Sequence, residues 1–259
     1  TLSAAQLIEQ MQFAQAIAKE KTESCILHFD ERVREHLERR KYLIRRMKRA
    51  MKDDDFEMYF QPIYSWRENA FLSMEALLRL HDKDGALISP AEFIPVAEEV
   101  GIIDQIGWIV LDKVCAFMSS HPDMEVRTVS VNMSMQQFMD KGFAQKVEAC
   151  LQKYGLPPDR LRIEITERMI SENPQRTRDT LRQLTEKGIQ FYLDDFGMGY
   201  SNFAGVLSLP IETIKLDQTL VHGAFESDRK MVVLESLVDM LRKAGYSVVA
   251  KGIETEEQA

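Results

Sequence analysis

The sequence predicts an α/β fold in which the strands of a parallel sheet alternate with helices. The chain has 259 residues, 45% of them hydrophobic, which is enough for a large core. From residue 56 onward, short runs rich in Val, Ile, Leu and Tyr alternate with helical segments, which favours βαβ units with right-handed crossovers. An open doubly wound sheet would fit, but no glycine-rich phosphate turn follows an early strand. Seven strands precede the end of the chain, so we predict a (β/α) barrel that lacks its last strand.

Composition and charge exclude several classes of protein. A net charge of −8 argues against duplex nucleic acid as a partner, because such binders neutralise phosphates with clustered Lys and Arg. Cys25, Cys115 and Cys150 are widely spaced in apolar contexts, which is typical of thiols in a reducing compartment. No run is long enough to span a membrane and no signal peptide opens the chain, so we expect no membrane contact from this segment.

The first part of the chain predicts a helix–strand–helix segment. Ser3 and Gln6 form a capping-box pattern, which predicts a helix over residues 4–20. Residues 23–30 are strand-like, and a long helix is expected over 31–52. A basic cluster within 38–52 carries apolar residues at helical spacing, so we interpret it as a helix with a solvated basic face.

The expected strands share apolar, β-branched or aromatic runs that end at turn residues. They span residues 56–64, 71–80, 126–134, 161–166, 189–194, 213–217 and 246–251.

The expected helices begin at caps or prolines and several end at glycine. Ser89, Pro90 and Glu92 combine a capping box with proline at the first helical position. Beyond residue 56 the helices are expected over 90–101, 104–119, from the strand at 126–134 to 155, 174–187, 201–206 and 226–243, with a further start capped by Thr255 and Gln258.

Polar side chains lie where the expected strands end. They are Glu75, Asn132, Glu164, Asp194, Asp195, Lys215 and Lys251. A barrel gathers these ends on one face. Ligand sets that contain oxygen without His or Cys suit Mg²⁺ or Mn²⁺, and two metals are usual for phosphoester cleavage. Asp194 and Asp195 would point to opposite sides of a regular strand. Because carboxylates that share a pocket repel one another unless metals are bound, we expect both to be ligands, one to each of two ions.

These residues carry a resemblance to the EAL domain family over residues 56–259. The motifs are FQPI (60–63), EALLR (75–79), VNMS (131–134), EITE (164–167), DDFGMGYS (194–201), IKLD (214–217) and KGIET (251–255). The resemblance implies a TIM-type barrel with an antiparallel first strand. It also implies binding of cyclic di-GMP and cleavage of one phosphodiester to linear pGpG.

The resemblance also implies roles for single residues. Glu75, Asn132, Glu164 and Asp194 match metal ligands, and Asp195 serves the second ion. Lys215 matches the lysine at the attacking water or phosphate, and Glu167 the glutamate that holds the loop after DDFG. The expected substrate contacts are Gln61, Arg79 and Asp217.

Residue 251 departs from the family pattern. The family reads AEGVET where this chain reads AKGIET, so Lys251 replaces a glutamate proposed as metal ligand or general base. A charged lysine cannot accept a proton from water, which leaves Glu254 as another candidate base. Two functions therefore stay open, a metal-dependent cyclic di-GMP phosphodiesterase of impaired turnover and a degenerate module that binds the dinucleotide or a protein without turnover.

The segment before the barrel resembles the end of a GGDEF domain. QAIAKEK (15–21) and ILHFD (26–30) carry this resemblance. We therefore divide the chain into a GGDEF-like remnant (1–30), a linker helix (31–53) and an EAL barrel cut before its eighth strand (54–259). Because the chain begins with Thr, we expect it to be the cytoplasmic part of a larger bacterial signalling protein, homodimeric through the barrel.

Overall fold

The computed structural model describes residues 7, 8, 11, 14, 15, 30–197, 203–206, 209–256 and 258. Nearly all of the predicted helix over 4–20, the strand over 23–30 and the GGDEF-like segment lie outside the described residues, as does Cys25. The chain forms two compact units. The first comprises Thr1–Glu57 with Arg79–Ile103, and the second Met58–Leu78 with Asp104–Ala259.

The first unit is built on helix α2 (Glu31–Asp53), which confirms the helix predicted over 31–52. Asp30 caps its first turn by accepting a hydrogen bond from the Val33 amide at 3.0 Å. The helix ends at Asp54, which adopts φ +55°. Apolar residues at helical spacing form its buried side, among them Leu37, Leu43 and Met47.

Most basic residues of α2 are exposed, as interpreted from sequence, but two of them also form ion pairs with a neighbouring helix. Arg39 and Arg40 form ion pairs with Glu92 and Glu99, both on helix α3 (Pro90–Glu99). Ser89 does precede α3, but its side chain makes no capping hydrogen bond.

Arg46 is the buried member of this basic side, with 8% of its surface exposed. Its guanidinium pairs with Asp55 at 2.5 Å and its Nε donates to the His81 carbonyl at 2.6 Å, which balances the buried charge, although its buried Nη1 has no hydrogen-bond partner. The short strand β3 (Leu87–Ile88), which the sequence did not predict, pairs antiparallel with Leu80 and His81.

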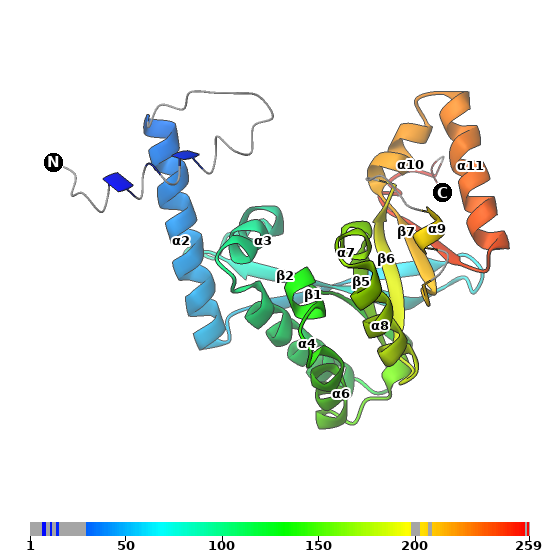
Figure 1. Cartoon of the computed structure of the whole chain (residues 1–259), viewed down its shortest axis with the longest axis horizontal. Coiled ribbons are helices and arrows are strands. Elements are labelled where there is room, and N and C mark those ends of the chain that lie inside the picture. The colour runs from blue at the N-terminus through cyan, green and yellow to red at the C-terminus, as the bar shows by residue number, and fades with distance from the viewer. Residues whose placement is uncertain are drawn as a thin grey trace. The chain divides into compact units, whose positions relative to one another are not determined.

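Seven strands follow one another in sheet order as they do in sequence, which confirms the predicted strand count (Figure 1). They are β1 (Glu57–Ser65), β2 (Ala70–His81), β4 (Thr128–Asn132), β5 (Leu161–Thr166), β6 (Gln190–Phe196), β7 (Thr213–Leu216) and β8 (Ser247–Ala250). All neighbours from β2 to β8 along this path are parallel. Four residues join β1 to its neighbour β2, a link that is long enough only for an antiparallel pair.

The sheet curls but does not close into a ring. The hydrogen-bonded path runs from β1 to β8 without a pairing between these two strands in the described part of the chain. The fold is therefore an open TIM-like barrel with an antiparallel first strand and no last strand, as predicted. Residues such as Val129, Ile163 and Leu193 are fully buried, as expected for a parallel sheet covered by helices.

The helices of the second unit follow the predicted order with three differences. They are α4 (Ile103–Ser120), α5 (Met135–Phe138), α6 (Phe143–Lys153), α7 (Glu167–Glu172), α8 (Pro174–Thr185), α9 (Phe203–Val206), α10 (Gln218–Ala224) and α11 (Asp228–Lys243), with a 3-10 turn η1 (Pro158–Arg160). The helix expected up to residue 155 is interrupted, because Asp140 accepts a hydrogen bond from the Gly142 amide and turns the chain between α5 and α6. Helices α7 and α10 were not predicted.

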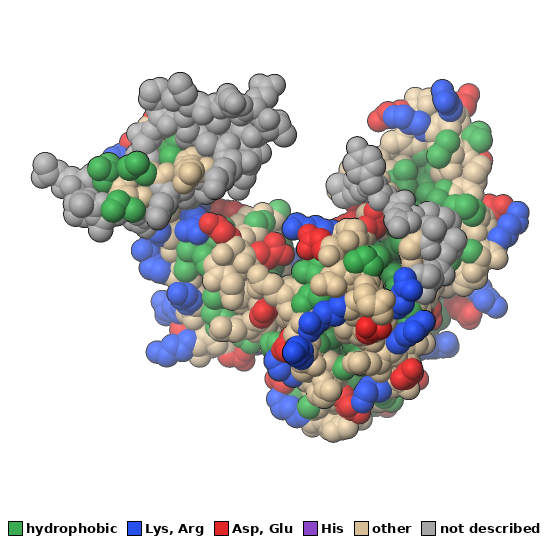
Figure 2. Space-filling view, in the orientation of Figure 1, with side chains coloured by type: hydrophobic (Ala, Val, Ile, Leu, Met, Phe, Trp, Pro, Cys, Tyr) green, Lys and Arg blue, Asp and Glu red, His purple; other side chains and the backbone are tan. Residues whose placement is uncertain are grey.

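The surface of the described residues agrees with the mixed charge of the sequence. Lys and Arg side chains are interspersed with Asp and Glu on the face shown in Figure 2. Cys115 is buried and Cys150 half-buried, both as free thiols. None of the described helices is both long and apolar enough to cross a membrane.

Phe191 on β6 tests the central packing of the sheet. Its side chain is fully buried and meets the Phe138 ring edge-on at 6.5 Å. We expect Phe191→Ala to lower the free energy of unfolding by about 3–5 kcal/mol, because it leaves a cavity. Val232→Ala, at a site 59% exposed, is the control and should change it by less than about 0.5 kcal/mol. Urea denaturation measures both, and equal effects would contradict this packing.

Candidate active site

The polar residues predicted at the strand ends gather at one edge of the sheet. Strand register places Asn132 opposite Glu164, at the ends of β4 and β5. Asp194 pairs with Thr166, the last residue of β5, and Lys215 lies near the end of β7. The sheet therefore collects on one edge groups that are far apart in sequence.

Lys215 lies at the centre of this cluster and is almost fully buried. Its ammonium donates to both carboxylate oxygens of Glu164, at 2.7 and 2.9 Å, and to Glu75 at 2.5 Å. Asp194 Oδ1 lies 3.9 Å away. The Asn132 side chain joins the cluster by donating to Glu75 at 3.0 Å. One cation thus holds three carboxylates together.

Lys251 forms a second cationic centre on the neighbouring strand end. Its ammonium lies 2.5 Å from Asp194 Oδ1 and 2.9 Å from Asp195 Oδ1. Asp194 Oδ1 is buried and receives no hydrogen bond of good geometry, so its contact with Lys251 is a close ion pair rather than an aligned hydrogen bond. The two lysines share Asp194 between them.

A β-bulge brings both aspartates to the same side. Asp195 adopts φ +52°, and the pairing of β6 with β7 shifts register between Leu193 and Phe196. The side-chain alternation of a regular strand is broken there, so the expectation that Asp194 and Asp195 face opposite sides is wrong. Glu167 supports the turn that follows by accepting a hydrogen bond from the Gly197 amide at 3.0 Å.

The buried charges shift one another's protonation. Burial, with the charges of Glu75 and Asp194, raises the pKa of Glu164 to about 7, although Lys215 opposes the shift. Burial alone would lower the pKa of Lys215, but the charges of Glu164, Glu75 and Asp194 outweigh it and raise that pKa. The same balance, with Asp194 and Asp195 as partners, raises the pKa of Lys251. Both lysines are therefore charged at neutral pH.

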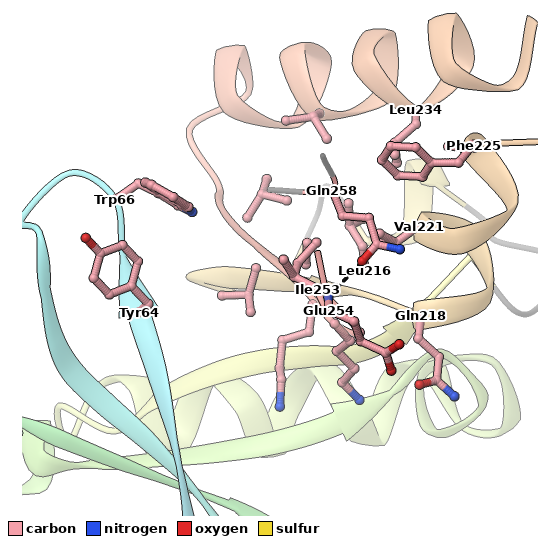
Figure 3. A pocket seen from close by; sticks show the side chains of 18 of the residues that line it. Tyr64, Trp66, Leu216, Gln218, Val221, Phe225, Leu234, Ile253, Glu254 and Gln258 are labelled. Carbon is pink, nitrogen blue, oxygen red and sulfur yellow. Dashed lines mark hydrogen bonds between the residues drawn. The ribbon is translucent and has the colours of Figure 1, made fainter. Parts of the chain in front are cut away.

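The cluster opens into a groove of about 1700 Å³ within the second unit. Glu75, Lys215 and Lys251 lie in its wall, and so does the predicted substrate contact Gln61. Figure 3 shows Glu254 and Gln218 on one side of this groove, with Leu234 and Phe225 above them on α11 and beyond α10.

The other two predicted substrate contacts, Asp217 and Arg79, are not among the residues that line this groove. Asp217 caps α10, and its Oδ1 accepts hydrogen bonds from the amide and the hydroxyl of Thr219. Burial alone would raise the pKa of Asp217, but these hydrogen bonds and the charge of Lys251 lower it. Arg79 lies farther along β2, in the first unit, and is half-buried.

The sequence did not single out the aromatic residues of the β1–β2 hairpin. Tyr64, Trp66 and Phe71 line the groove, and Trp66 is 72% exposed. Figure 3 shows Trp66 and Tyr64 on the hairpin, facing the groove from the side opposite Ile253. The signal that could have found them is the presence of three large aromatic residues in and beside the four-residue turn between the two strands.

The chemistry of the cluster fits a divalent cation. Oxygen atoms of Glu75, Glu164 and Asp194 lie within 4.8 Å of one another. Glu164 and Asp194 are 1% and 5% exposed, so their charges need cations close by. An oxygen-only donor set is the kind that Mg²⁺ and Mn²⁺ take.

Comparison with known proteins gives concordant results. Residues 44–259 match the EAL domain family. The signalling protein YkoW of Bacillus subtilis is 32% identical over 213 residues, which are 82% of this chain and 27% of that protein. The cyclic di-GMP phosphodiesterase NbdA of Pseudomonas aeruginosa is 32% identical over 214 residues, with the same two shares. This chain thus spans about a quarter of the length of these relatives.

Solved structures agree with the sequence matches. The PaMucR phosphodiesterase in complex with c-di-GMP aligns with a TM-score of 0.78 at 30% identity, over 83% of this chain and 88% of that one. The FimX EAL domain of Pseudomonas aeruginosa bound to c-di-GMP aligns with a TM-score of 0.77 over 83% of this chain and 87% of that one. At 22% identity, the second match supports the fold alone.

The raised pKa of Glu164 predicts that metal affinity depends on pH. Protons compete with the cation for this carboxylate below about pH 7 and no longer do so above it, so affinity rises with pH. Between pH 6 and pH 8 we expect the affinity for Mn²⁺ to increase about tenfold, the ratio for one competing proton. Mn²⁺ titration followed by electron paramagnetic resonance measures it. Glu164→Gln should bind more weakly and with little pH dependence; a flat profile for the unchanged protein would contradict the assignment.

Proposed function

The chain belongs to the EAL domain family, and we propose that it binds cyclic di-GMP and cleaves it slowly to linear pGpG. The observation that carries this proposal is the cluster of Glu75, Glu164 and Asp194 around Lys215 at one edge of the sheet. Relatives that cover most of this chain are named cyclic di-GMP phosphodiesterases, and the structure of one such phosphodiesterase holds c-di-GMP.

Glu75, Asn132, Glu164 and Asp194 would hold a divalent ion. Asp195 matches the ligand of a second ion, but Lys251 pairs with its carboxylate. Such ions, when bound, polarise a phosphoryl oxygen and lower the pKa of an attacking water. Gln61 and the aromatic residues of the β1–β2 hairpin line the groove. The dinucleotide would lie there, because bases stack on aromatic side chains. Arg79 and Asp217 remain proposed substrate contacts, Asp217 through the helix that it caps.

Lys215 would act on the phosphate rather than on a proton. Its ammonium is charged and buried, and it is fixed by three hydrogen bonds to carboxylates. A fixed positive charge in a dry site stabilises the negative charge that develops on a phosphoryl group. Glu167 would support this geometry indirectly, by holding the turn at Gly197 after the two aspartates.

Turnover is the step that Lys251 impairs. Its ammonium is held by Asp194 and Asp195 and its pKa is raised, so it cannot take a proton from water. Glu254, exposed in the groove wall, is the nearest alternative base in the sequence. A second candidate function follows from the same ion pairs, namely binding of cyclic di-GMP as a sensor without hydrolysis.

We also propose that the domain works in the bacterial cytoplasm as one part of a larger signalling protein, and that it forms a homodimer. The relatives support membership in a larger protein, because this chain covers only 27% of YkoW and of NbdA.

One incubation separates the two candidate functions. The protein is mixed with cyclic di-GMP and Mn²⁺, and bound dinucleotide and released pGpG are measured in the same samples. A slow phosphodiesterase gives binding followed by pGpG, whereas a sensor gives binding alone. Absence of binding contradicts both.

Asp194→Ala tests the metal assignment. Asp194 is buried and is shared by both lysines, so its loss removes a ligand and one of the carboxylates that face each ammonium. We expect the thermal protection by cyclic di-GMP with Mg²⁺ or Ca²⁺ to disappear. The control is Asp179→Ala on the exposed side of α8, which should retain it. Equal melting temperatures for Asp194→Ala and the unchanged protein with both ligands would show that the assignment is wrong.

Lys251→Glu tests the cause of slow turnover. The change replaces a cation by a carboxylate that can accept a proton or bind a metal. We expect pGpG formation to rise by about a hundredfold or more, the usual contribution of a positioned acid–base group. Initial rates at saturating cyclic di-GMP and Mn²⁺ measure it. Rapid hydrolysis by the unchanged protein, unaffected by this substitution, would assign the base to Glu254 or another group.

A further inference from the structure

The ammonium of Lys251 occupies a position that suits a metal ion. It lies 2.5 Å from Asp194 Oδ1 and 2.9 Å from Asp195 Oδ1. A divalent ion shared by the same two oxygens would lie at roughly 2.0–2.6 Å from each. The ammonium and such an ion would therefore fill the same space, and their like charges would repel.

The formal charges of the cluster also favour a single divalent cation. Glu75, Glu164, Asp194 and Asp195 contribute four negative charges when ionised, and the ammonium groups paired with them, on Lys215 and Lys251, contribute two positive charges. Two negative charges remain, which one divalent cation balances. A second divalent cation would leave the pocket with an excess of positive charge.

The position of Lys251 is fixed by the backbone on both sides. Its amide donates to the Leu216 carbonyl at 3.1 Å, which extends the β7–β8 ladder by one residue. The next residue, Gly252, has φ +74°, and a Cβ there would lie 2.8 Å from Gln218 Cβ and 2.8 Å from His222 Nε2. His222 Nε2 donates to the Gly252 carbonyl at 2.6 Å. The chain is thus held so that residue 251 faces the aspartates.

We propose that Lys251 replaces one cation of the cluster, so that this chain binds a single divalent ion, with Glu75, Glu164 and Asp194 as ligands. Lys215, which lies 3.9 Å from Asp194 Oδ1 and donates to Glu75 and Glu164, would have to shift from these two carboxylates to admit the ion. The buried Asp194 Oδ1 supports this assignment, because it has no aligned hydrogen-bond donor and faces cations on two sides. The inference rests on the proposed function only in taking the cluster as a divalent-ion site, and it holds whether or not the chain hydrolyses the dinucleotide.

The number of ions bound tests the proposal directly. Mn²⁺ alone is titrated into the full chain without dinucleotide, and bound ions per chain are counted by equilibrium dialysis with elemental analysis. We expect one ion for the unchanged protein and two for Lys251→Glu. Lys251→Met removes the charge and nearly keeps the length of the side chain. Its dissociation constant for a second Mn²⁺ should be at least tenfold lower than that of the unchanged protein. Lys243→Met, at an exposed lysine paired with Asp239, is the matched control and should bind one ion.

The outcomes separate this inference from the proposed function. Two ions of similar affinity in the unchanged protein overturn the inference and leave the phosphodiesterase proposal standing. One ion in both the unchanged protein and Lys251→Glu also overturns it, because then Lys251 does not set the number. No Mn²⁺ binding by any of these proteins, with circular dichroism showing them folded, overturns the inference and the metal-dependent function together.

Discussion

The site depends on interactions that keep carboxylates ionised at the buried carboxyl ends of the strands. Glu164 and Asp194 are almost fully buried, and Lys215, itself 1% exposed, lies among them. Removing one partner of such a buried group of charges costs about 3–5 kcal/mol, because the others are left uncompensated. The sheet supplies the geometry, but the edge is stable only while cations balance these side chains. Ammonium groups do so in part, and a divalent ion would complete the balance.

The position of the second lysine determines what this balance permits. Lys215 is at the end of β7 and Lys251 follows β8, the neighbouring parallel strand, so the two ammonium groups meet Asp194 from adjacent strands. The bulge at Asp195 turns both aspartates toward Lys251. With a divalent ion balancing its remaining negative charge, a pocket arranged in this way would accept an anionic phosphate, but it would lack a proton acceptor at residue 251. The proposed outcome is binding with slow chemistry, because only interactions that strengthen in the transition state accelerate the reaction.

The sequence predicted most of this fold because strand periodicity and the order of apolar runs are local properties. The seven strands and the long helix α2 were found from such patterns. What it missed depends on contacts between distant residues. The backbone of Asp195 departs from a regular strand in a bulge that no period reveals. Helix α10 is short and capped by Asp217, a residue interpreted as a substrate contact. The position of polar residues at strand ends correctly predicted that Glu75, Glu164, Asp194 and Lys215 lie together. The pairing of Lys251 with both aspartates could be seen only in the structure.

The central claim is that an ammonium of the chain stands where a metal ion would otherwise bind. Crystals of the unchanged protein grown with Mn²⁺ and cyclic di-GMP, measured at the manganese absorption edge, test it most directly. We predict one anomalous peak per chain, coordinated by Glu75, Glu164 and Asp194, with the Lys251 ammonium still in contact with Asp195. Two peaks bridged by Asp194 and Asp195, with the Lys251 side chain turned away into solvent, would contradict it.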